Sequence, residues 1–218
     1  MKSQQQGTNP VGAVMVVGAG IAGVQAALDL ADAGFYVYVV EAKPAIGGVM
    51  AQLDKTFPTN DCSMCILSPK LVECGRHLNI EILVPARVQG IAGEPGNFTV
   101  TVNQTARYID AAKCIACGLC AEKCPKKVPD AFNQGLISRK AAYVLYPQAV
   151  PLKYSIDAPN CLFFKKGGKC KACEKFCPTG AVDFSQTDQP RDLQVGAVIL
   201  APGFKPYDPT KYGAYHYA

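Results

Sequence analysis

The sequence predicts an α/β fold that is interrupted by a smaller α+β domain rich in cysteine. Three observations predict it. A strand, a glycine turn, a helix and a second strand follow one another near the start of the chain, and another buried strand lies near its end. Eight of the eleven cysteines fall between Cys114 and Cys177, between these two regions. We therefore expect the cysteine block, residues 108–189, to be inserted between two parts of one α/β domain, residues 1–107 and 190–218.

The composition indicates a folded protein with a substantial core. The 218 residues are 49% hydrophobic and 18% charged, with a net charge of +5. No apolar run reaches the roughly 18 residues of a membrane span, and no interleaving of basic and aromatic residues indicates a nucleic-acid surface. Residues 1–10 are polar and unlike an export signal. We therefore expect a reducing, cytoplasmic location, and the cluster chemistry described below suggests an anaerobe.

The first elements form a βαβ unit of the kind that binds nucleotides. An apolar run predicts a buried strand over Val11–Val17, and a G-x-G-x-x-G turn follows it. Ala22–Ala33 has helical composition, and a second strand over Phe35–Val40 ends at Glu41. In such units the glycines admit a pyrophosphate to the helix N-terminus, and the acid accepts from the ribose. The turn residues expected to bind the dinucleotide are Gly18, Ala19, Gly20, Ile21, Ala22 and Gly23.

Two further segments favour FAD over NAD. Gly47 and Gly48 follow the acid closely, as in flavoproteins with two dinucleotide-binding domains, where this segment passes the flavin. Val195–Gly203 resembles the return strand and Ala-Thr-Gly turn of the same flavoproteins, with Pro202 replacing the threonine. We therefore expect a Rossmann-like FAD-binding domain of this type. Its further cofactor-binding residues are expected to be Ala42, Lys43, Gly47, Gly48, Ala201, Pro202 and Gly203.

Short elements are expected between the nucleotide motif and the cysteine block. Ile80–Val84 is predicted as a strand, and Ala86–Gly93 with Asn97–Asn103 as a hairpin around a Gly-Glu-Pro-Gly turn. Tyr108–Asp110 is expected to enter the cysteine domain and Phe184–Gln189 to leave it. A small antiparallel unit of this kind is typical of the same flavoproteins.

The cysteine block consists of two runs that each end in Cys-Pro. Their spacings are C-x2-C-x2-C-x3-C-P and C-x8-C-x2-C-x3-C-P, the pattern of bacterial ferredoxins with two [4Fe–4S] clusters, with one gap lengthened. Zinc sites do not need the third cysteine, and disulfide frameworks belong to small secreted domains. The fourth cysteine of each run usually ligates the other cluster. One cluster is therefore assigned to Cys114, Cys117, Cys120 and Cys177, and the other to Cys161, Cys170, Cys173 and Cys124.

Three interpretations are open for the remaining cysteines, Cys62, Cys65 and Cys74. They could hold a third cluster completed by a ligand from elsewhere. The Cys62-x2-Cys65 pair could be a redox-active dithiol. All three could also be buried structural residues. His77, one of only two histidines, is expected to be structural.

Several segments resemble one known family. Asn60–Glu73, the following Gly75–His77, and Tyr146–Pro151 closely resemble HdrA, the iron–sulfur flavoprotein of heterodisulfide reductase. The order of flavin motif, ferredoxin insert and return strand resembles it too, so that the likeness spans nearly all of Val11–Pro209. It implies an oxidoreductase subunit that binds FAD and several [4Fe–4S] clusters, with flavin-based bifurcation in some complexes. It also favours a third cluster at Cys62, Cys65 and Cys74.

The resemblance further implies partners. We expect a multi-subunit complex, with a dimer as one form, that exchanges electrons with a ferredoxin or with a hydrogenase or dehydrogenase subunit. Members of that family usually continue into a further nucleotide-binding domain, so we expect a fragment or a short form. No acid, base or nucleophile constellation indicates substrate chemistry on this chain. The alternative is a non-catalytic, ferredoxin-like electron-transfer subunit with an empty nucleotide fold.

Overall fold

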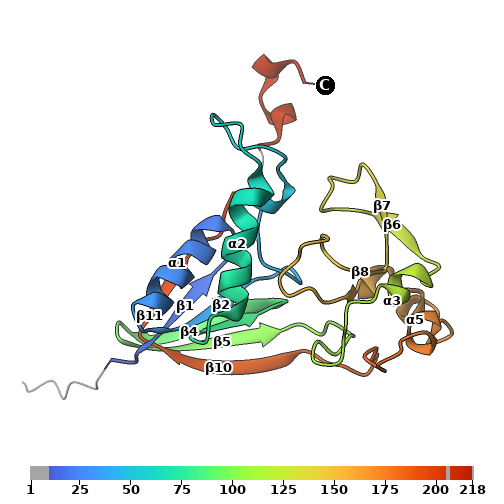
Figure 1. Cartoon of the computed structure of the whole chain (residues 1–218), viewed down its shortest axis with the longest axis horizontal. Helices are drawn as coiled ribbons and strands as arrows, with labels where there is room; N and C mark the ends of the chain where they lie inside the picture. Colours follow the sequence, from blue (N-terminus) through green and yellow to red (C-terminus); the bar gives the residue numbers. More distant parts are fainter. Residues whose placement is uncertain (1–9, 205–206, 218) are drawn as a thin grey trace, which may run out of the picture.

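The computed structural model describes residues 10–204 and 207–217. They form two units, an α/β unit and a cysteine-rich unit, which lie side by side in Figure 1. Residues 1–9, most of the segment in which no export signal is expected, lie outside the described part.

A parallel sheet forms the centre of the α/β unit. Its strand order is β11-β1-β2-β3, and the strands are β1 (Ala13–Val17), β2 (Tyr36–Val40), β3 (Ile80–Leu83) and β11 (Ala197–Leu200). Val16 of β1 lies opposite Val39 of β2 on one side and Ile199 of β11 on the other. Two helices, α1 (Ile21–Asp32) and α2 (Ser63–Arg76), cover one face of this sheet (Figure 1). Helix α2 was not expected from the sequence.

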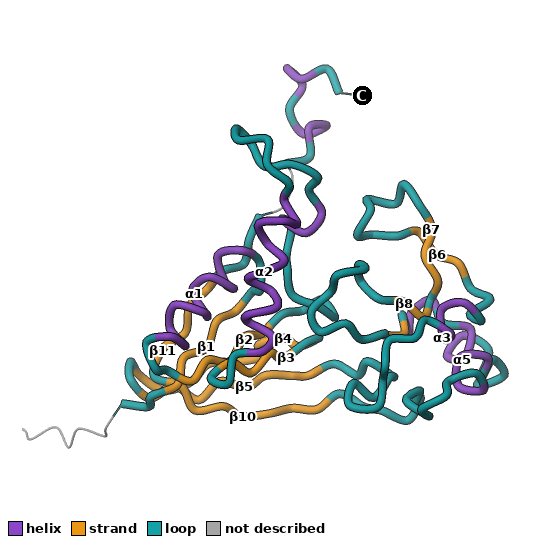
Figure 2. Tube along the Cα trace, in the orientation of Figure 1, coloured by secondary structure: helices purple, strands orange, loops and turns teal. Residues whose placement is uncertain are grey.

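An antiparallel sheet covers the opposite face. It has the order β10-β5-β4, with β4 (Ala86–Glu94), β5 (Asn97–Gln104) and β10 (Gln189–Val195) (Figure 2). Side chains of β1 alternate between the two cores, because Val16 packs with the helices and Met15 with the antiparallel sheet, both fully buried. Each such side chain contributes about 1.5 to 3 kcal/mol by burial. The two cores together fix the position of the sheet and of its carboxyl edge.

The return to the parallel sheet differs from the prediction. The expected strand over Val195–Gly203 begins too early, because Val195 ends β10 and the parallel strand β11 begins at Ala197. Gly196 between them turns the chain from one sheet to the other. A Cβ atom on Gly196 would lie 2.4 Å from the carbonyl oxygen of Val11, which leaves no space for a side chain there. The predicted hairpin therefore gains β10 as a third strand.

The cysteine-rich unit is built from short elements between β5 and β10. They are α3 (Leu119–Glu122), β6 (Lys127–Pro129), β7 (Ser138–Lys140), β8 (Ala142–Tyr143), β9 (Ser155–Ile156), α4 (Leu162–Lys165) and α5 (Ala172–Lys175). Short 3₁₀ turns occur at Met50–Gln52, Ala158–Asn160, Pro209–Lys211 and Gly213–Tyr215. The rings of Phe163 and Phe184 stack 3.8 Å apart. Cysteines form much of the unit's core, together with Ile109, Ile156 and Val182.

Candidate flavin and iron–sulfur sites

The glycine turn lies at the carboxyl edge of the parallel sheet, where backbone segments approach closely. A Cβ atom on Gly18, whose φ is +99°, would lie 2.1 Å from the carbonyl oxygen of Ala201. A Cβ on Gly23 would lie 1.9 Å from the carbonyl oxygen of Gly18. Helix α1 begins directly after Gly20, and no side chain caps its N-terminus. Its first amides are thus available to an anion such as a pyrophosphate.

Glu41 lies beside this turn at the end of β2. Its Oε2 accepts from the amide of Ala19 at 3.0 Å, and its Oε1 accepts from the amide of Lys43 at 2.9 Å. A carboxylate has about four acceptor positions, so both oxygens keep capacity for ribose hydroxyls. The role on the ribose stays a prediction, and the carboxylate also orders the glycine turn.

The two glycines after Glu41 meet different neighbours. Gly48 lies against the turn, because a Cβ there would be 2.6 Å from the Cα of Gly20. Gly47 instead leaves space for Tyr146 of the cysteine-rich unit, whose hydroxyl would be 2.6 Å from an added Cβ. The structure thus brings the turn, Glu41, Gly48 and Ala201 to one edge. Ile21 and Ala22 lie in the first turn of α1, whereas Ala42, Lys43, Pro202 and Gly203 are exposed nearby.

This edge fits FAD in two respects. Its glycines allow the close backbone packing that a dinucleotide-binding turn requires, and the uncapped helix supplies amide donors for a pyrophosphate. The contact residues themselves stay a prediction.

The eight ferredoxin-type cysteines line two pockets, with four in each. Each pocket encloses about 300 Å³ of space that no atom fills, part of it open to solvent. One is lined by Cys114, Cys117, Cys120 and Cys177, and the other by Cys124, Cys161, Cys170 and Cys173. Each pocket therefore takes three cysteines from one run and the last cysteine from the other.

The thiols of each pocket do not meet at one point. Within residues 10–204 and 207–217, no three His, Cys, Asp or Glu side chains converge closely enough to hold one metal ion. The ligands of a cubane bind different irons at its corners and so stand further apart than the ligands of one ion.

Burial affects the protonation of the pocket thiols. Burial raises the pKa of Cys120 to about 12 and that of Cys173 to about 11. Because thiolates are the metal ligands, a cation must offset this penalty. At Cys177 burial acts to raise the pKa, but hydrogen bonds from the amide of Ala181 and the hydroxyl of Thr179 lower it below its usual value. Hydrogen bonds to sulfur of this kind tune cluster potentials.

Two lysines, neither expected from the sequence to contribute to the pockets, hold the backbone of pocket cysteines. The Nζ of Lys153 donates to the carbonyl oxygen of Cys114 at 2.6 Å, and the Nζ of Lys140 donates to that of Cys124 at 2.6 Å. In each pocket the backbone carbonyl of one cysteine is thus held by a lysine ammonium group. No sequence signal marks these residues, because they lie 39 and 16 residues from their partners.

Hydrogen bonds join the cysteine-rich unit to Ile46 and Gln52, in the segment that follows Glu41. The amide of Ile46 donates to the carbonyl of Val150 at 2.9 Å, and the hydroxyl of Tyr146 donates to the carbonyl of Ile46. The side chain of Gln52 donates to the carbonyl of Phe132 at 2.7 Å. The cysteine-rich unit is therefore attached at the edge where the flavin is expected.

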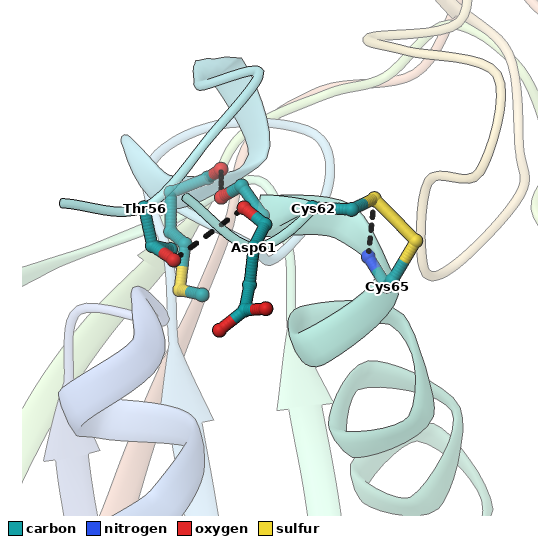
Figure 3. Close-up of a disulfide and its surroundings, with 6 residues drawn as sticks. Thr56, Asp61, Cys62 and Cys65 are labelled. Carbon is teal, nitrogen blue, oxygen red and sulfur yellow. Dashed lines mark hydrogen bonds between the residues drawn. A yellow bond between two sulfur atoms is a disulfide. The ribbon is translucent and has the colours of Figure 1, made fainter. Parts of the chain in front are cut away.

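The structure does not bring Cys62, Cys65 and Cys74 together. Cys62 and Cys65 form a disulfide at the start of α2 (Figure 3), and the Sγ of Cys62 accepts from the amide of Cys65 at 3.2 Å. Cys74 lies nine residues beyond Cys65, about 14 Å at the rise of an α-helix, and is fully buried in the core. A cluster held by all three is therefore incompatible with this arrangement. The pair fits the dithiol interpretation, and Cys74 fits the structural one.

The disulfide predicts a labelling result. If the protein is unfolded in an alkylating reagent without reductant, the peptide with Cys62 and Cys65 is expected to stay unlabelled. Cys74 serves as the control, because it is free and should be labelled at once. After reduction, all eleven cysteines should carry label. Labelling of both residues before reduction, measured by mass spectrometry of peptides, would show that the pair is not oxidised.

His77 is structural, as expected. Its Nε2 lies 3.2 Å from the carboxylate of Asp32, and its Nδ1 accepts from the amide of Asn79 at 3.1 Å. The ring thus fixes the end of α2 against α1.

Comparison with known protein families agrees with both sites. A model described as FAD dependent oxidoreductase matches residues 13–63, and a model described as 4Fe-4S binding domain matches residues 107–130. The expectation of FAD and [4Fe–4S] cofactors is confirmed at this level, whereas the number of clusters stays a prediction.

Curated relatives give a more specific result. The chain is 47% identical over 93% of its length to the HdrA component of the H(2):CoB-CoM heterodisulfide,ferredoxin reductase of Methanothermobacter marburgensis. It is also 47% identical over 93% of its length to HdrA of the CoB--CoM heterodisulfide reductase of Methanocaldococcus jannaschii. The resemblance to HdrA is confirmed. An HdrA-like protein from Archaeoglobus profundus matches at 47% identity over 91% of the chain.

The similarity to HdrA covers only part of those relatives. The chain spans 30% of the length of the first two and 31% of the third. Among solved structures, L-proline dehydrogenase from P.horikoshii is 25% identical over 41% of this chain and 18% of that chain, with a TM-score of 0.37. Among residues 10–204 and 207–217, none of the helices has the length and hydrophobicity of a membrane span.

Proposed function

We propose that this chain is the electron-transferring iron–sulfur flavoprotein part of a heterodisulfide-reductase-like complex. It passes electrons between FAD and two [4Fe–4S] clusters toward partner subunits. The observation that carries the proposal is the grouping of eight cysteines into two pockets of four, in a unit attached beside a nucleotide-binding edge. Bound FAD would exchange electrons in pairs, whereas each cluster carries one, so the combination converts between the two modes.

The residues of the chain have separate roles in this proposal. The turn from Gly18 to Gly23 and Glu41 hold the dinucleotide, and Gly48 keeps the following segment against it. Cys114, Cys117, Cys120 and Cys177 hold one cluster, and Cys124, Cys161, Cys170 and Cys173 hold the other. The cysteine-rich unit is an insert of the flavin domain, which is of the type with two dinucleotide-binding domains. The contacts of Ile46, Tyr146 and Gln52 between the two units support a short path from the flavin to the clusters.

The relatives suggest the partners. Their names include a heterodisulfide and ferredoxin reductase, and we propose that this chain likewise works with partner subunits and a ferredoxin-type carrier. Flavin-based bifurcation stays a prediction of the resemblance. A unit built around reduced thiols supports a reducing compartment, and we propose the cytoplasm.

Anaerobic purification with a count of iron, sulfide and flavin tests the proposal. We expect about eight irons, about eight sulfides and one flavin per chain, because each cubane holds four of each atom. Eight irons without flavin would support the alternative of an iron–sulfur protein with an empty nucleotide fold. Flavin without iron would contradict the assignment of the cysteines.

A further inference from the structure

Arg107 is a buried cation at the junction of the two units. The residue is 7% exposed. Its Nη2 donates to the carbonyl oxygens of Pro44 at 2.8 Å and Val84 at 3.1 Å, and its Nη1 donates to that of Lys153 at 3.3 Å. The guanidinium thus joins the segment between Glu41 and Gly47, the end of β3 and the cysteine-rich unit.

No side chain neutralises this charge. In the described part of the chain, no carboxylate forms an ion pair with Arg107, and all three of its acceptors are neutral carbonyls. Burial lowers the pKa of Arg107 to about 10, against the opposing effect of Tyr143 and Cys114. The group is therefore still a cation at neutral pH. A buried charge without a counter-charge is strongly unfavourable, so the site calls for a negative group that side-chain carboxylates do not supply.

The pocket lined by Cys114, Cys117, Cys120 and Cys177 lies next to this cation. Cys114 lines that pocket, and so does Ile109, which lies two residues after Arg107. Lys153 continues the contact, because its carbonyl accepts from Arg107 and its ammonium donates to the carbonyl of Cys114. A [4Fe–4S] cluster held by four thiolates is negative and becomes more so on reduction. It is a counter-charge of the required sign.

We propose that Arg107 is a positioning residue for the cluster of Cys114, Cys117, Cys120 and Cys177, which supplies its counter-charge. This rests on the cluster assignment of the proposed function. Arg107 holds the segment between Glu41 and Gly47 to the part of the chain that carries this cluster. Because a nearby cation favours the more negative state, it also raises the reduction potential of this cluster relative to the other.

Arg139 is the matched control for Arg107, on the side of the pocket that contains Cys124. It is adjacent in sequence to Lys140, which donates to the carbonyl of Cys124. Unlike Arg107, Arg139 has a carboxylate partner, since its Nη2 lies 2.9 Å from the Oδ2 of Asp157. The pair is nearly neutral as a whole, and its removal in an R139M/D157N variant takes away no net charge.

Reduction potentials test the proposal. Iron and sulfide are counted first, and both clusters are then titrated anaerobically with detection by electron paramagnetic resonance. A C173S variant, which keeps only the cluster of Cys114, assigns the signals. We expect R107M and R107Q to lower the equilibrium constant for reduction of that cluster at least tenfold, about 59 mV for one electron. The equilibrium constant for reduction of the other cluster should change less than threefold. R107K and R139M/D157N should leave both nearly unchanged.

Each other outcome overturns the proposal. An unchanged potential in an R107M or R107Q protein with full iron would mean that Arg107 only holds the fold. A shift in R107K as large as that in R107Q would mean that geometry, not charge, is responsible. If R107M fails to fold, R107Q decides, because it keeps amide donors for the carbonyls. Absence of clusters in the unaltered protein would instead refute the proposed function.

Discussion

Replacing Cys120 and Cys177 together by serine is expected to remove one cluster and leave the other, with iron falling from about eight to about four per chain. The two residues belong to different runs but line the same pocket. Cys120 and Cys124 belong to the same run but line different pockets. A C120S/C124S variant is therefore expected to damage both clusters and to retain almost no iron.

A C74A variant is the control for these two. Cys74 is a free, fully buried cysteine outside both pockets, so its removal should leave about eight irons. Iron, sulfide and the resonance of the reduced clusters are measured under anaerobic conditions in all variants. If C120S/C124S kept about four irons and C120S/C177S almost none, each run would hold its own cluster, and the assignment would be wrong.

Replacing Gly23 by alanine is expected to abolish tight flavin binding and to destabilise the α/β unit by about 2 to 3 kcal/mol. Helix propensity alone predicts the opposite sign, because alanine is better than glycine within a helix by about 1 kcal/mol. The added Cβ, however, would lie 1.9 Å from the carbonyl oxygen of Gly18. Relief of this clash must move the turn away from the helix N-terminus, so we expect at least a tenfold loss of flavin affinity.

A G90A variant is the control. Gly90 lies in β4, and an added Cβ there would meet nothing within 4 Å. We expect its stability to change by less than about 0.5 kcal/mol and its flavin content to be normal. Stability is measured by urea unfolding and flavin content by absorbance after denaturation. A stabilised G23A protein with full flavin would show that the turn does not pack as described.

The sequence was sufficient to predict those elements and sites whose defining residues follow one another closely in the chain. The strand β1, the glycine turn and β2 were predictable because an apolar run, three glycines and a terminal acid follow one another within one βαβ unit. The two pockets were predictable for a related reason. Cysteine spacing, with the rule that the last cysteine of a run crosses to the other cluster, specifies the same two groups of four that line them.

The remaining three cysteines show that sequence spacing alone does not identify a metal site. Cys62, Cys65 and Cys74 have intervals that suit a metal site, but α2 places Cys74 about three turns away from the other two. The helix itself is hard to predict, because Pro69 lies inside it and Cys62, not a Ser or Asp, is its N-cap.

The strand β10 and residue Arg107 depend on distant partners. Leu193 and Val195 are buried whereas Asp192 and Gln194 are exposed, but Pro190 weakens the strand pattern. The proline is tolerated because β10 is an edge strand of its sheet. Arg107 has no motif at all. Its burial follows from three carbonyls that lie 63, 23 and 46 residues away.

An anaerobic electron count tests most directly whether one chain couples a flavin to two clusters. The protein as purified is titrated with a reductant of low potential while flavin absorbance and cluster resonance are recorded. FAD takes two electrons, each cluster takes one, and the Cys62–Cys65 disulfide takes two more where it is reduced. Counting only the electrons that bleach the flavin or raise a cluster signal, we expect about four per chain. About two electrons, with either the flavin or the clusters silent, would contradict the proposed function.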